Sequence, residues 1–335
     1  MHKILVISPS WVGDTMLAQP MLARLKQRHP GCQIDVFAPP WTEALLRHMP
    51  EVHDVIINPF PHGALQIGER MKAGQMLSRG SYDQVIVLPN SFKSALAPYF
   101  AKIPQRTGFR GEMRFGLLTD ARKLDKRQVP LMVERFAQLA EPPMHPVHRP
   151  LANPRLHVTE QQRERVLQRL ELKLDQPVVI FCPGAEYGPA KRWPVPYFAE
   201  LGQELKKRGY ALWLIGSSKD KEVAEKIAAL GNQHAHNLCG RTDLGDAIAL
   251  LSCASLVVSN DSGLMHLAAA QDRPMLALFG SSSPEFTPPL SDKAEVIRLK
   301  LPCSPCFKRE CPLGHFNCMM QLTPQKVMQH IPGPL

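Results

Sequence analysis

The chain has 335 residues, of which 44% are hydrophobic and 21% charged, and its formal net charge is +10. A chain of this length is too long for one ordinary hydrophobic core, so we expect two domains of roughly 150 residues each. No apolar run approaches the roughly 18 residues that a membrane span needs, and the apolar run at the start ends at Ser8, too soon for a signal peptide. We therefore expect a cytoplasmic protein.

The excess of basic residues favours anionic partners, namely nucleic acid, phosphorylated sugars or an anionic membrane face. The sequence has no zinc-finger, RNP or basic-zipper pattern. We therefore expect no nucleic-acid partner.

Apolar strands alternate with amphipathic stretches in the first half of the chain. The pattern predicts strands at 3–8, 34–38, 55–57 and 82–88, and helices at 15–28, 42–48, 66–79 and 91–100. Such alternation predicts a parallel sheet wrapped by helices. Five prolines between residues 141 and 154 cannot propagate a helix or a central strand, so we place the interdomain linker there and expect it to act as a hinge.

The same alternation restarts after the linker. It predicts strands at 178–182, 211–215, 256–259 and 275–279, and helices at 159–170, 196–208, 221–230, 244–253 and 263–270. The chain is thus expected to be an α/β protein of two Rossmann-like domains, 1–150 and 151–320, followed by a C-terminal helix and tail, 321–335. Their parallel sheets should face each other across a cleft, with ligands outside the carboxyl ends of the strands.

The strongest local signal is VVSNDSGLMHLAAA at 257–270, where a buried strand runs into a polar turn and then a helix. The free N–H groups and the positive dipole end of such a helix form a site suited to pyrophosphate. Ordinary N-capping by Asp261 or Ser262 explains the same residues equally simply. The motif alone leaves both interpretations open.

Two other loops also follow predicted strands. In FCPGAEYGPAKRWP, Lys191 stands where a cation could neutralise a departing diphosphate, although a solvated basic loop would look the same. In ISPSWVGDTMLAQP, Asp14 is either an N-cap or a base facing the cleft. The latter loop matches neither the Walker nor the G-x-G-x-x-G pattern, so we expect no nucleotide site in the first half.

Eight segments taken together resemble one family. They are PSWVGD, LPNSFKSALAPYF, RTGFRGEMRFGLLTD, LMVERF, CPGAEYGPAKRWP, GSSKD, NDSGLMHLAAA and FGSSSPEFTPPL. In this order, and over nearly the whole chain, they resemble the ADP-heptose lipopolysaccharide heptosyltransferases of glycosyltransferase family 9, most of all the heptosyltransferase II type. The resemblance implies a GT-B fold and no cofactor or catalytic metal.

The reaction that the resemblance implies is inverting transfer of L-glycero-D-manno-heptose. The donor would be ADP-heptose, and the acceptor would be the first heptose of heptosyl-Kdo2-lipid A in the inner core of lipopolysaccharide. The first domain would bind this acceptor and the second domain the donor. Such an enzyme would work at the cytoplasmic face of the inner membrane, where we expect a monomer that can associate with the inner leaflet.

The resemblance also assigns roles to individual residues. Asp14 would be the general base, and Lys191 would contact the donor phosphates. The further donor-binding positions would be Gly184, Ser217, Asp220, Asp261, Ser262, Gly263 and His266. This set suits inversion, which needs one carboxylate for the acceptor proton and cations or N–H groups for the departing ADP.

Basic residues are concentrated between residues 93 and 127, which suits a phosphorylated acceptor and an anionic leaflet. We assign acceptor contacts to Lys93, Arg106, Arg110 and Arg114, while a solvated basic surface explains much of the segment equally well. Near the C-terminus a second cluster consists of Cys303, Cys306, Cys311, His315 and Cys318. It could hold structural zinc or an iron–sulfur cluster, or remain free thiols, and the sequence leaves this open.

Two alternatives remain. The chain could be a heptosyltransferase I or III acting on another core acceptor, or a non-catalytic nucleotide-sugar-binding protein of the same fold. The presence of Asp14, Lys191 and Asp261 argues against the second alternative, because a binding protein needs no base.

Overall fold

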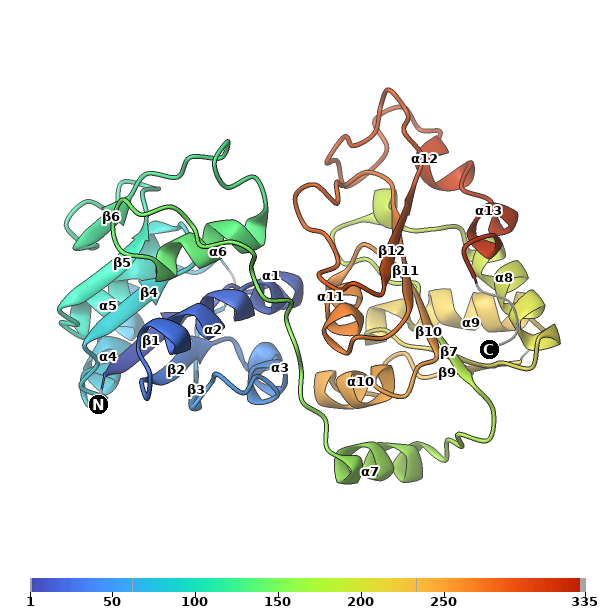
Figure 1. Cartoon of the computed structure of the whole chain (residues 1–335), viewed down its shortest axis with the longest axis horizontal. Coiled ribbons are helices and arrows are strands. Elements are labelled where there is room, and N and C mark those ends of the chain that lie inside the picture. Colours follow the sequence, from blue (N-terminus) through green and yellow to red (C-terminus); the bar gives the residue numbers. More distant parts are fainter. Residues whose placement is uncertain (1, 62, 233, 332–335) are drawn as a thin grey trace. The chain divides into compact units, whose positions relative to one another are not determined.

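The computed structural model describes residues 2–61, 63–232 and 234–331, and the chain divides into two compact units, Met1–Pro154 and Arg155–Leu335. Within the described residues each unit has one six-stranded sheet whose strand pairs are all parallel, with helices packed around it (Figure 1). The predicted α/β class with two parallel sheets is confirmed. In the described part of the chain, no helix is both long and apolar enough to cross a membrane.

The first unit has the strand order β3-β2-β1-β4-β5-β6. Its strands are β1 (Lys3–Ile7), β2 (Gln33–Ala38), β3 (Asp54–Ile57), β4 (Gln84–Val87), β5 (Gln105–Phe109) and β6 (Asp120–Arg122). Its helices are α1 (Val12–Leu17), α2 (Gln19–Arg28), η1 (Pro40–Thr42), α3 (Glu43–Arg47), α4 (Ile67–Ser78), η2 (Phe92–Ala95), α5 (Leu96–Phe100) and α6 (Met132–Ala140). The central strands β1 and β4 are buried, as expected where helices cover both faces of a parallel sheet.

The second unit has the strand order β12-β11-β10-β7-β8-β9. Its strands are β7 (Val178–Cys182), β8 (Ala211–Leu214), β9 (Ala235–Asn237), β10 (Leu256–Asn260), β11 (Met275–Phe279) and β12 (Ala294–Arg298). Its helices are α7 (Glu160–Leu170), η3 (Pro189–Lys191), α8 (Val195–Lys207), η4 (Ser218–Asp220), α9 (Lys221–Leu230), α10 (Leu244–Leu251), α11 (Gly263–Ala270), α12 (Asn317–Met320) and α13 (Pro324–Met328). The C-terminal residues Leu322, Val327 and Ile331 belong to the same apolar core as β7 and β10.

The sequence prediction was wrong in several places. The helix expected at 15–28 is two helices, α1 and α2, that meet at Ala18, because Pro20 has no N–H with which to continue the first helix. The helices expected at 42–48 and 91–100 each begin with a 3-10 turn. Four strands, β5, β6, β9 and β12, were not predicted at all.

The proline-rich segment at 141–154 contains no helix or strand, as predicted. Its first residues nevertheless belong to the first unit, because Glu141 is buried and accepts a hydrogen bond of 2.7 Å from Nε of Arg24 on α2. Arg149 in turn donates from Nε to Glu134 on α6, also at 2.7 Å. Much of the segment is therefore held against α2 and α6.

Candidate functional site

In the second unit, two polar loops follow the adjacent parallel strands β7 and β10, so both begin at the same edge of the sheet. The loop after β7 carries Lys191 in η3, and the loop after β10 carries Asp261. The Nζ atom of Lys191 lies 2.5 Å from Oδ2 of Asp261, with side chains only 16% and 5% exposed. The Lys191 cation also lies 5.1 Å from the centre of the Tyr187 ring. The structure thus brings together two residues that the sequence assigned to the donor site from motifs 70 positions apart.

Asn260 holds these loops in place. Its side-chain Nδ2 donates to the carbonyl of Pro183 at 2.7 Å, and its Oδ1 accepts from the backbone N–H of Trp193 at 3.1 Å. The residue is completely buried at the end of β10. Sequence reasoning did not assign Asn260 a role, although it lies in the polar turn that marked the motif.

His266 is buried on α11, one turn after the start of this helix. The pKa of His266 is lowered to about 4, mainly by burial; Asp261 raises this pKa and Lys191 lowers it. The imidazole is therefore neutral at physiological pH, and the charges of Lys191 and Asp261 both act on it.

Three buried hydroxyl groups at this edge lack hydrogen-bond partners in the described structure. They are the Oγ atoms of Ser262, which precedes α11, and of Ser281 and Ser282, which follow the neighbouring strand β11. A buried hydroxyl without a partner is costly, so each would gain from an oxygen of a ligand or a water. Together with the free N–H groups at the start of α11, these hydroxyls suit phosphate or sugar oxygens.

The remaining assigned donor residues form a compact local turn. Asp220 accepts hydrogen bonds through Oδ2 from the backbone N–H and the hydroxyl of Ser217, at 2.9 and 2.8 Å. A Cβ atom on Gly184 would lie 2.5 Å from the Asp220 carboxyl group, so glycine is needed there to admit this side chain. Contact of Gly184, Ser217 or Asp220 with a donor stays a prediction.

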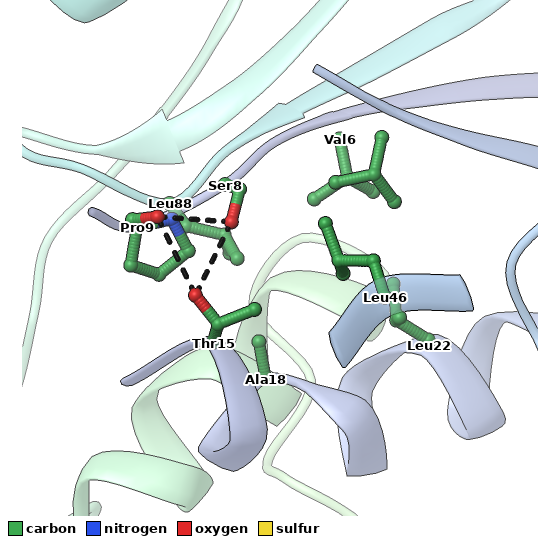
Figure 2. Close-up of a pocket in the computed structure, with 9 residues that line it drawn as sticks. Val6, Ser8, Pro9, Thr15, Ala18, Leu22, Leu46 and Leu88 are labelled. Carbon is green, nitrogen blue, oxygen red and sulfur yellow. Dashed lines mark hydrogen bonds between the residues drawn. The ribbon is translucent and has the colours of Figure 1, made fainter. Parts of the chain in front are cut away.

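In the first unit, Asp14 lies in the first turn of α1, directly after the loop that follows β1. Figure 2 shows how Ser8, Pro9 and Thr15 close this loop. The Thr15 hydroxyl donates to the carbonyl of Trp11 at 2.9 Å, and the Ser8 hydroxyl donates to the carbonyl of Pro9 at 3.0 Å. Thr15 is buried and lines a small apolar cavity, so the backbone of the helix turn that carries Asp14 is anchored to the interior of the first unit.

The four basic residues assigned to the acceptor differ in their surroundings. Arg114 is only 3% exposed, and its two Nη atoms donate to a group that includes the carbonyls of Pro89 and Phe109. Arg106 donates to the carbonyls of Leu117 and Ile103. Arg106 and Arg114 thus fix loops of the fold, and their contact with an acceptor stays a prediction.

The other two basic residues are more open. Arg110 is exposed, although its Nε donates to the carbonyl of Ala121, and Lys93 is half-buried in η2. These two side chains are the better placed to meet a ligand in solution, and their contact with an acceptor stays a prediction.

The cysteine cluster near the C-terminus consists of free thiols. All eight cysteines of the chain are free thiols in the structure, and in the described residues no three His, Cys, Asp or Glu side chains are arranged to hold a metal ion. The pKa of the Cys311 thiol is lowered by backbone N–H groups, of which that of Phe316 lies 3.4 Å from Sγ. Burial and the neighbouring thiols raise the pKa of Cys318.

Comparison with known proteins decides the family. The model of glycosyltransferase family 9 (heptosyltransferase) matches residues 70–317, and the lipopolysaccharide heptosyltransferase 2 of Salmonella typhimurium is 49% identical over 98% of this chain and 97% of its own length. This chain belongs to glycosyltransferase family 9. The family that the eight motifs predicted is confirmed.

Two further similar proteins are informative. The solved structure of E. coli ADP-heptose LPS heptosyltransferase II is 46% identical, covers 98% of this chain and 97% of its own, and superposes with a TM-score of 0.89. The lipopolysaccharide heptosyltransferase 1 of Pseudomonas aeruginosa is 31% identical over 92% of this chain and 87% of its own. This family 9 chain is therefore more similar to these relatives named heptosyltransferase 2 or II than to the one named heptosyltransferase 1.

Proposed function

We propose that this chain transfers L-glycero-D-manno-heptose from ADP-heptose to the first heptose of heptosyl-Kdo2-lipid A, with inversion. The observation that carries the proposal is the buried Lys191–Asp261 pair beside the start of α11, within a family 9 chain. The acceptor follows from the higher identity to heptosyltransferase 2 of Salmonella typhimurium, 49% against 31% for the Pseudomonas heptosyltransferase 1.

In this proposal the second unit binds the donor. The N–H groups at the start of α11 and the ammonium group of Lys191 take the two phosphates of ADP-heptose, whose negative charge increases as the sugar bond breaks. Asp261 holds Lys191 in position before the donor arrives. The unpartnered hydroxyls of Ser262, Ser281 and Ser282 supply hydrogen bonds to phosphate or sugar oxygens.

The first unit binds the acceptor, and Asp14 acts as the base. The acceptor hydroxyl oxygen forms a bond to the anomeric carbon, while the bond from that carbon to the β-phosphate oxygen breaks and its electron pair leaves with ADP. The hydroxyl proton passes to the Asp14 carboxylate. One displacement from the opposite face inverts the anomeric centre and needs neither a covalent intermediate nor a second carboxylate.

The proposed acceptor is anchored in a membrane, so the enzyme has to work at that surface. Association with the anionic inner leaflet is supported by the net charge of +10 and by the nine Lys and Arg against three Asp and Glu between residues 93 and 127. We propose peripheral association through these charges, with Lys93 and Arg110 the nearest to the acceptor.

The proposal is tested by incubating the purified chain with ADP-heptose and, separately, Kdo2-lipid A or heptosyl-Kdo2-lipid A, and measuring product mass. We expect one added heptose only on the heptose-bearing acceptor, and an inverted anomeric configuration by NMR. Addition to Kdo2-lipid A alone would indicate a heptosyltransferase I. Tight binding of ADP-heptose without any product would indicate a nucleotide-sugar-binding protein.

A further inference from the structure

Two exposed tryptophans lie close to the proposed base, Trp11 in the sequence and Trp41 in the fold. Trp11 is 45% exposed and Trp41 is 48% exposed, whereas the other two tryptophans of the chain, Trp193 and Trp213, are 2% and 1% exposed. An exposed indole keeps a large apolar ring in water, and paired exposed rings commonly mark a contact surface. Neither ring has a part in the donor binding or the proton transfer described above.

The fold places both rings at the edge of the sheet that carries Asp14. Trp11 is the N-cap residue of α1, and Asp14 follows three residues later in the first turn, so both residues lie at the same end of this helix. Trp41 lies in η1, directly after β2, which pairs with β1 in parallel. Its indole Nε1 donates to the carbonyl of Ser10 at 2.8 Å and so connects the two loops.

The Trp41 ring is held through its own N–H, and Trp11 is held at its backbone. The carbonyl of Trp11 accepts hydrogen bonds from the backbone N–H and the hydroxyl of Thr15, both at 2.9 Å. The N–H of Trp41 is used by Ser10, so this ring offers a ligand only its apolar faces. Aromatic faces beside a carboxylate fit a sugar ring, whose C–H face packs on the aromatic ring while a hydroxyl group reaches the base.

We propose that Trp11 and Trp41 form a stacking platform for the terminal sugar ring of the acceptor. The inference rests on the proposed function and adds to it the group that positions the attacking sugar against Asp14. A bilayer is the less suitable occupant, because tryptophans at a membrane interface use their N–H toward the polar region, and that of Trp41 is already bonded within the chain.

The buried pair Trp193 and Trp213 makes a direct measurement possible, because acrylamide should quench the fluorescence of Trp11 and Trp41 preferentially. The probe is a deacylated, heptose-terminated Kdo oligosaccharide, added without donor. We expect it to protect the quenchable fraction of the fluorescence, and the Kdo-terminated analogue and ADP to protect it much less. Unchanged quenching at saturating heptose-terminated oligosaccharide would overturn the platform.

Variants separate stacking from general damage. Trp11→Ala and Trp41→Ala should each raise KM for the acceptor about tenfold, as expected for losing part of one ring's contact area, while the Kd for ADP stays as in the wild type. Trp11→Phe should restore most of the affinity because it keeps an aromatic face. Leu174→Ala is the control, since this exposed apolar side chain lies in the second unit, after α7.

Three results count against the platform. They are an unchanged acceptor KM in both alanine variants, an equal rise in KM in Leu174→Ala, or a parallel loss of ADP binding. Thermal unfolding of each variant shows whether it is folded. Failure of the proposed function is distinguishable, because it appears as no heptose product from the wild type whatever the quenching shows.

Discussion

Acidification should destabilise the second unit through His266. The imidazole is 6% exposed, and burial lowers its pKa from 6.5 to about 4, so the folded protein keeps it neutral. In the unfolded chain the same group takes up a proton near pH 6.5. The unfolded state therefore binds more protons between about pH 6.5 and about pH 4, and stability falls as the pH is lowered through this window.

The size of the effect follows from the pKa difference. Between about pH 7 and about pH 5 the His266 contribution amounts to a loss of about 2 kcal/mol, since each pKa unit corresponds to about 1.4 kcal/mol. For a unit of this size such a loss lowers the midpoint of thermal unfolding by roughly 4–8 °C. Above about pH 7 this loss is absent, because the imidazole is neutral in both states, and the midpoint should no longer depend on this group.

The assay compares the wild type with His266→Gln, which keeps a neutral polar group but cannot titrate in this range. Thermal unfolding of both is followed from about pH 7.5 down to about pH 5. The constant cost of the substitution cancels, and the wild type should lose about 2 kcal/mol more than the variant. Equal pH slopes in the two proteins would refute the reasoning.

A second readout follows the pKa itself. NMR titration of histidine ring carbons in the folded wild type should show one resonance that titrates near pH 4 and is missing in the variant. Because Lys191 lowers and Asp261 raises the pKa of His266, Lys191→Met should move that titration upward and Asp261→Asn downward. Shifts of the opposite sign would mean that these side chains do not face the imidazole as the structure places them.

Further outcomes follow from other sites. Asp14→Asn should lower kcat by about two to four orders of magnitude in the heptose-transfer assay, with the calorimetric Kd for ADP little changed; equal losses of both would contradict its role as base. Lys191→Ala should weaken ADP binding roughly ten- to a hundredfold in the same calorimetry, and unaltered affinity would remove it from the donor site. Asn260→Ala should cost about 1–3 kcal/mol in urea unfolding, because two buried backbone groups lose their partner, whereas a neutral change would show that these loops hold without it. Iodoacetamide should alkylate Cys311 faster than Cys318 near pH 7.5, because the pKa of the first thiol is lowered and that of the second raised, and peptide mass mapping at early times reads the order.

The central strands and the loops after them could be predicted from the sequence because buried strands are rich in apolar residues and the loops are not. β7, β10 and β11 are completely buried and are apolar except for the last two residues of β10, and each is followed by a polar or glycine-containing turn. Two edge strands, β6 and β9, were missed for the converse reason. β6 and β9 have three residues each and are partly exposed, so their composition carries no apolar alternation to detect.

The contacts within the donor site could not be predicted in the same way. The turn before α11 was readable as strand, polar turn and helix, but the pairing of Lys191 with Asp261 depends on the adjacency of β7 and β10, whose order in the sheet does not follow the chain. Asn260 shows the same limit, since an amide in a polar turn looks like any turn residue until its two partners are in place.

The basic segment shows why a count of charges overstates a binding surface. A guanidinium group has five donors, and where a loop leaves several carbonyls unpaired, one buried arginine can satisfy them all. Arg114 does this for the loops after β4 and β5, and burial lowers its pKa to about 10. Arg122 is likewise occupied by Asp120 and the carbonyl of Gln138. The positive charge that a phosphorylated acceptor can meet directly is therefore smaller than the sequence implies, and the buried arginines contribute instead by holding the loops that carry Lys93 and Arg110.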